Sequence, residues 1–158
     1  VLIKNNNAVL PIKDQQKILV IGDSADSLKI QTGGWTLDWQ GANNTNSDFP
    51  GSVTFLQALK EYENLEITHK NSLSNLDLNQ NYDLVIVAYG EEPYAEGIGD
   101  RKNLFYRDSK TLNTLKRLKR NGNKVVSIFF TGRPLWTNEF INLSDAFVVA
   151  WLPGTESR

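Results

Sequence analysis

The sequence predicts a three-layer α/β/α sandwich with a mostly parallel sheet of about five or six strands. Four short apolar runs are continuous rather than alternating, as in strands covered on both faces. Amphipathic helical patterns fall between these runs, which favours parallel strands. With 158 residues, 40 % of them hydrophobic, the chain can form one domain, 1–158, with its own core. The four runs are residues 17–21, 83–88, 124–130 and 146–150.

Two weaker elements complete the first half of the chain. Residues 65–68 alternate apolar and polar side chains, which predicts a strand at an edge of the sheet. Ser52 is a suitable N-cap for a short helix. The apolar face of that helix would carry Val53, Leu56 and Leu59.

The clearest helix is predicted over residues 108–120. Its leucines recur at helical spacing, and Asp108 or Ser109 can cap its start. Lysines and arginines crowd its end, where they complement the helix dipole, and Gly122 supplies a stop. The basic cluster is therefore interpreted as a solvated helix end rather than a nucleic-acid patch.

Composition excludes several kinds of function. The net charge of -1 gives no general attraction to nucleic acid or to an anionic membrane, so neither is expected as a partner. The chain has no Cys and one His, His69, expected at the surface, so it can build neither a Ser-His-Asp triad nor a multi-His metal site alone. We expect no metal and no cofactor. Because the chain starts at Val1 and lacks Met, we expect it to be a segment of a longer protein.

The most unusual local sequences follow the predicted strands. Parallel strands bring their carboxyl ends to one edge of the sheet, where ligands bind in such folds. After the first strand only Gly22 stands where a dinucleotide motif requires three glycines, and no phosphate-binding loop is present. A nucleotide-binding sandwich therefore remains only a minor alternative.

Two tryptophans lie close together in a Gly-rich loop. A Trp offers a flat apolar face with a polar N–H, which suits the C–H face of a sugar ring. Trp39 is expected to pack the loop onto the domain. For Trp35 the residues alone leave both interpretations open, sugar stacking and loop packing.

Four acidic residues crowd the loop after the second apolar run. A carboxyl at the end of a buried strand can act as a general acid, although a solvated acidic loop is the commoner case. Arg133, between Gly and Pro after the third run, is expected to hold neighbouring loops in place or to contact a ligand. The acidic residues are Glu91, Glu92, Glu96 and Asp100.

Taken together, these motifs resemble the C-terminal α/β sandwich domain of glycoside hydrolase family 3, of the β-glucosidase and β-glucan exohydrolase type. Each motif is weak alone, but the ordered set is specific. The set comprises residues 1–6 and 10–12, Val20-Ile21-Gly22, Gly33-Gly34-Trp35-Thr36, Gly90-Glu91-Glu92-Pro93-Tyr94-Ala95-Glu96, Gly132-Arg133-Pro134 and residues 150–156.

The resemblance implies a retaining glycosidase whose site lies between two domains. An N-terminal barrel of the same chain would supply the nucleophilic Asp, and Glu91 would be the acid/base. Trp35 would clamp the sugar of the leaving group. The substrate would be a β-glucoside or β-glucan oligosaccharide, and the compartment periplasmic or secreted. This chain alone is then expected to be inactive.

A second hypothesis treats the chain as a non-catalytic binding module. The same loops would then bind a carbohydrate or a partner domain without chemistry. A Glu91 side chain turned away from the edge of the sheet would favour that alternative.

Overall fold

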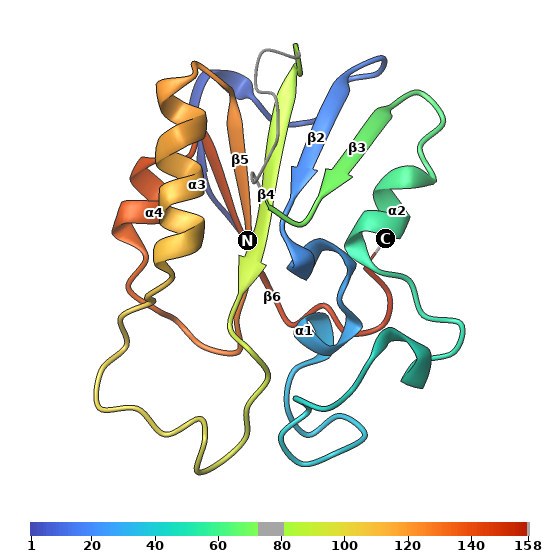
Figure 1. The fold of residues 1–158 in the computed structure, drawn as a ribbon, viewed down its shortest axis with the longest axis vertical. Coiled ribbons are helices and arrows are strands. Elements are labelled where there is room, and N and C mark those ends of the chain that lie inside the picture. The colour runs from blue at the N-terminus through green and yellow to red at the C-terminus, as the bar shows by residue number, and fades with distance from the viewer. Residues whose placement is uncertain (73–80, 158) are drawn as a thin grey trace.

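The computed structural model describes residues 1–72 and 81–157, which fold around a six-stranded sheet (Figure 1). The strand order is β1-β6-β5-β4-β2-β3. Five strands run parallel, and β1 is antiparallel to β6. The strands are β1 (Leu2–Asn5), β2 (Lys17–Ile21), β3 (Glu66–Lys70), β4 (Leu84–Gly90), β5 (Val125–Phe130) and β6 (Ala146–Trp151).

Helices cover both faces of the sheet, so the expected three layers are confirmed (Figure 1). One face carries α3 (Ser109–Arg120) and α4 (Asn138–Asn142). The opposite face carries the 3-10 turn η2 (Asp23–Asp26) and the helices α1 (Leu28–Thr32) and α2 (Phe55–Lys60). Two more 3-10 turns, η1 (Asn6–Ala8) and η3 (Asn46–Asp48), lie in connections.

The central strands are buried on both sides because each face packs against helices. In β2, Leu19 and Ile21 join the cluster under α3 and α4, where Leu115 and Leu118 of α3 are fully buried. Their neighbours Ile18 and Val20 join the cluster under α1 and α2. The continuous apolar runs therefore have the physical cause inferred for them: alternate residues feed two separate cores.

The structure confirms the five expected strands and corrects the helix predicted from Ser52. The helix α2 begins at Phe55, because the side chain of Thr54 accepts from the N–H of Gln57 as its cap. Val53 instead bridges to Glu156 near the end of the described chain. The strand β1 was not predicted, since its exposed side chains carry no core pattern.

The long helix α3 follows its prediction closely. The side chain of Asp108 accepts from the N–H of Thr111 at 2.9 Å, which makes Asp108 the N-cap. Gly122 follows the helix with a φ of 81°, in the left-handed region that ends helices.

The carboxyl ends of the parallel strands meet at one edge, drawn at the bottom of Figure 1. The loop after β4 and the loop after α1 both extend beyond this edge. In the part of the chain that the structure describes, no helix is long and apolar enough to cross a membrane. No cluster of three potential metal ligands occurs among the same residues.

Candidate active site

Glu91 stands directly after β4, where the backbone of the strand still fixes it. Its N–H donates to the carbonyl of Phe130 in β5 at 3.0 Å. A Cβ on the preceding Gly90 would lie 2.2 Å from that same carbonyl oxygen. Only glycine therefore allows the ends of β4 and β5 to approach each other this closely. The main chain of Glu91 is therefore placed by the sheet rather than by the loop.

The Glu91 carboxylate lies among three donors. Its Oε1 accepts from Arg101 Nη1 and from Arg133 Nε, each at 3.1 Å. Its Oε2 accepts from Thr131 Oγ1 at 2.7 Å. The side chain is only 9 % exposed, because the two guanidinium groups cover it. Two ion pairs and a hydroxyl thus hold this carboxylate at the edge of the sheet, mostly beneath the surface.

Arg133 connects three parts of the loop after β4. Its guanidinium carbon lies 3.8 Å above the ring centre of Tyr94, and its Nη1 donates to the carbonyl of Gly99. Burial and the nearby charge of Glu91 raise the pKa of Tyr94, while the charge of Arg133 acts in the opposite direction. The holding role considered for Arg133 is the one that the contacts show.

The two tryptophans of the Gly-rich loop are exposed. Trp35 is 70 % and Trp39 54 % exposed, so the expectation that Trp39 packs the loop onto the domain was wrong. The backbone N–H of Trp35 donates to the backbone carbonyl of Trp39 at 2.9 Å, and Trp35 has a φ of 57°. Their ring centres are 6.2 Å apart at 49°. The backbone hydrogen bond between Trp35 and Trp39 closes a tight turn, and both indoles lie on its exposed side.

Glu96 joins these tryptophans to the loop of Glu91. Its Oε2 accepts from the indole N–H of Trp35 and of Trp39, each at 3.1 Å. The side chain of Gln40 accepts from the N–H of Ala95 at 2.7 Å and donates to the carbonyl of Glu96 at 3.0 Å. Sequence reasoning missed these contacts, since its only signal was one acid among four in the loop.

The remaining acids of the loop have other surroundings. Glu92 pairs with Lys29 of α1 at 3.0 Å and is largely exposed. The lone His69 lies half-buried in the edge strand β3, with Nε2 3.1 Å from the carbonyl of Gly22, rather than on the open surface. Neither residue contacts Glu91 in any of these interactions.

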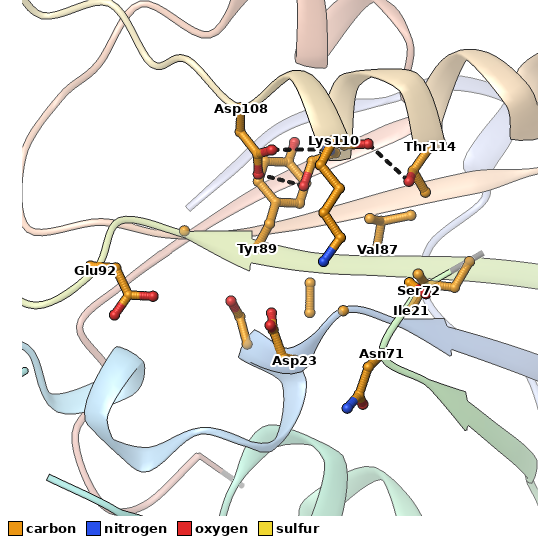
Figure 2. A pocket seen from close by; sticks show the side chains of 15 residues that line it. Ile21, Asp23, Asn71, Ser72, Val87, Tyr89, Glu92, Asp108, Lys110 and Thr114 are labelled. Carbon is orange, nitrogen blue, oxygen red and sulfur yellow. Dashed lines mark hydrogen bonds between the residues drawn. The ribbon is translucent and has the colours of Figure 1, made fainter. Parts of the chain in front are cut away.

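A polar hollow of about 180 Å³ lies beside Gly22, between β2 and β4 (Figure 2). The carboxylates of Asp23, Glu92 and Asp108 line it together with Lys110, which disfavours an anionic phosphate there. A Cβ on Gly22 would lie 2.1 Å from the carbonyl oxygen of Ala88, so strand packing explains this glycine. The nucleotide alternative therefore loses its main support.

Comparison with known proteins matches the whole chain to one family. Residues 1–158 match the family model described as the glycosyl hydrolase family 3 C-terminal domain. A lysosomal beta glucosidase of Dictyostelium discoideum is 33 % identical over 98 % of this chain and 21 % of its own length. A periplasmic beta-glucosidase of Salmonella typhimurium is 26 % identical over 99 % of this chain and 24 % of its own length.

Solved structures give the same result. The exo-1,3/1,4-beta-glucanase of a Pseudoalteromonas species is 44 % identical, with a TM-score of 0.92 over 99 % of this chain and 20 % of that one. The beta-glucosidase of Listeria innocua in complex with glucose is 27 % identical, with a TM-score of 0.75 over 99 % of this chain and 22 % of that one. This chain thus spans about a fifth to a quarter of these relatives. With sequence motifs, sheet order and family model in agreement, the chain belongs to the C-terminal domains of glycosyl hydrolase family 3.

Proposed function

We propose that this domain supplies the acid/base, Glu91, and a sugar platform, Trp35, to a retaining β-glucosidase or exo-β-glucanase. The observation that carries the proposal is their shared place at the carboxyl edge of the sheet. There a carboxylate fixed by strand β4 and an exposed pair of indoles are joined through one loop. No cofactor is needed for this chemistry.

The nucleophile is proposed to lie on another domain of the full-length protein. A retaining glycosidase needs two carboxyl groups roughly 5–5.5 Å apart, one as nucleophile and one as acid/base. These relatives are about five times as long as this chain, which leaves ample room for an N-terminal barrel bearing an Asp. The substrate would then bind in a cleft between the domains, a common location for such sites.

The contacts of Glu91 suit both halves of a two-step reaction. Thr131 Oγ1 lies 2.7 Å from Glu91 Oε2 and 2.7 Å from the carbonyl oxygen of Arg133. Its hydroxyl can donate to the ionised carboxylate. It can also turn to the Arg133 carbonyl and accept from the protonated acid. Thr131 can therefore stay hydrogen-bonded to Glu91 in either protonation state, while the two guanidinium groups on Oε1 favour the ionised, base form. In the proposed reaction, the acid form would turn its proton from Thr131 to the leaving oxygen once substrate is bound.

The exposed indoles and the relatives support one substrate class. An exposed indole face suits a pyranose ring. One relative is an exo-1,3/1,4-beta-glucanase, and a mutant beta-glucosidase from Listeria innocua has been solved with laminaribiose. We propose β-glucosides or β-glucan oligosaccharides as substrates. A periplasmic or secreted site of action is proposed because named relatives are periplasmic and lysosomal.

Glu91→Ala in the full-length enzyme tests the catalytic assignment. Loss of the acid should slow cleavage of a glucobiose by about 10²–10⁴-fold, since its leaving group needs a proton. An aryl glucoside with a good phenol leaving group should still form the glycosyl-enzyme. Azide should then restore turnover and give β-glucosyl azide, because it attacks without a general base.

Matched controls are Glu92→Ala and Glu96→Ala, which should show no rescue by azide. A second candidate, a non-catalytic carbohydrate- or partner-binding module, is favoured by the low exposure of Glu91. Unchanged glucobiose hydrolysis in Glu91→Ala would support that candidate. Rescue in Glu96→Ala instead would show that the wrong carboxylate had been chosen.

A further inference from the structure

The two exposed indoles of the Gly-rich loop converge on one oxygen atom. Trp35 Nε1 and Trp39 Nε1 each lie 3.1 Å from Glu96 Oε2. Each tryptophan is separated from Glu96 by at least 57 positions in the sequence, so tertiary folding brings these groups together. A solvated acid on a surface loop has no reason to receive both indole donors at one oxygen. The hydrogen bond from Trp39 is the largest cause that lowers the pKa of Glu96, followed by one from the backbone of Glu96 itself, and the hydrogen bond from Trp35 adds a smaller effect in the same direction.

The indole of Trp35 has little packing to fix its orientation. Trp35 is 70 % exposed, so its ring gains little from packing. An exposed ring that rotates freely would lose conformational entropy when a sugar stacks on it. A hydrogen bond at the N–H edge limits that rotation and leaves the ring faces uncovered. The Glu96 carboxylate thus pre-organises the platform before a ligand arrives.

The same loop carries Glu91, so the platform is held in a fixed relation to the acid/base. The side chain of Gln40 bonds the backbone on both sides of the Ala95–Glu96 peptide, at 2.7 and 3.0 Å. A Cβ on Gly34 would lie 2.0 Å from the carbonyl oxygen of Tyr94, which shows how closely the two loops approach. Tyr94 in turn lies under Arg133, which bonds Glu91.

We infer that Glu96 is a positioning residue for the leaving-group sugar: it holds Trp35 and Trp39 at a fixed place relative to Glu91. The inference rests on the proposed function and assigns Glu96 no proton transfer. Its effect should therefore appear for substrates whose leaving group is a sugar that reaches the platform. A small phenol leaving group should depend on it less.

Kinetics of the full-length enzyme test this inference with three variants. Glu96→Ala removes the acceptor, Glu96→Gln keeps an acceptor oxygen, and Glu92→Ala is the control for loss of a nearby acid on the same loop. For Glu96→Ala we expect the KM for a β-linked glucobiose to rise about three- to tenfold, as loss of modest hydrogen bonds produces. Its kcat should change less, and the KM for an aryl glucoside should rise less than that for glucobiose. Glu96→Gln should recover most of the loss.

The possible failures can be told apart. Equal glucobiose KM values for Glu96→Ala and Glu92→Ala would overturn the inference, while azide rescue of Glu91→Ala would still support the proposed function. Equal losses for both substrates in Glu96→Ala, with no recovery in Glu96→Gln, would also overturn it, because they indicate a loop that no longer folds. Azide rescue of Glu96→Ala would make Glu96 the acid/base and overturn both assignments.

Discussion

Replacement of Trp35 by alanine in the full-length enzyme should weaken transition-state binding of a disaccharide by about 2 kcal/mol. Trp35 is 70 % exposed, so about 170 Å² of a side chain of roughly 250 Å² is available for stacking. If a sugar covers about half of that, some 80 Å² at about 25 cal/mol per Å² gives about 2 kcal/mol. That corresponds to a loss of about thirtyfold in kcat/KM. Alanine is preferred to glycine because Trp35 has a φ of 57°, and glycine would increase the conformational freedom of the backbone there.

The assay compares kcat/KM for a glucobiose with that for an aryl glucoside whose small leaving group covers less of the indole. The loss should fall mainly on the glucobiose. Trp136→Ala is the matched control, because Trp136 is a second exposed tryptophan, with an exposed fraction of 61 %, and its ring packs against that of Phe105. Its substrate preference should stay that of the wild type.

Thermal unfolding separates this role from loop packing. An exposed Trp contributes little to the core, so Trp35→Ala should cost less than about 1 kcal/mol of unfolding free energy, against about 3–5 kcal/mol for a buried Trp. An equal kinetic loss for both substrates, accompanied by a large fall in Tm, would refute the reasoning.

Three further predictions concern activity and stability. The isolated domain should not hydrolyse aryl β-glucosides at any pH, because double displacement needs a second carboxyl; turnover that persists after contaminating glycosidases are removed would contradict this. Gly22→Ala should lower the unfolding free energy by about 2–4 kcal/mol through its clash with the carbonyl of Ala88. Gly51→Ala is the control, because nothing lies within 4 Å of a Cβ added there, and it should lower the unfolding free energy by about 1 kcal/mol. Denaturant titrations measure both variants, and equal losses for Gly22→Ala and Gly51→Ala would count against the clash. Burial raises the pKa of Tyr89, so the folded state retains this proton while the unfolded state loses it above about pH 10. The free energy of unfolding should therefore decline as pH rises beyond that value. The decline should be less steep in Tyr89→Phe, which lacks the titrating hydroxyl. Among the described residues, the Tyr89 hydroxyl has no partner at hydrogen-bond geometry, although it lies near Ser127.

The strands could be read from the sequence because each apolar run has one physical explanation. A continuous run such as Lys17–Ile21 is stable only where both faces of a strand are covered. The weak alternation of residues 65–68 likewise matched the half-buried edge strand β3. By contrast, β1 pairs with the distant strand β6, and the five-residue helix α4 is held by Phe140, which packs in the core cluster under α3. The local patterns of both elements are too short to predict them.

The sandwich fold and the edge where the loops gather could be predicted from the sequence, because strand patterns are local. The choice of Glu91 among four acids, and of a sugar-binding role for Trp35, came from the family resemblance of the ordered motifs. The surroundings of those two residues became visible only in the folded structure. Arg101, Thr131 and Arg133 reach Glu91 from positions 10 to 42 residues away. Trp39 was expected to pack its loop onto the domain, yet its indole N–H donates to Glu96, 57 residues along the chain. Such contacts depend on how the loops after β4, α1 and β5 fold over one edge of the sheet, which no local pattern encodes.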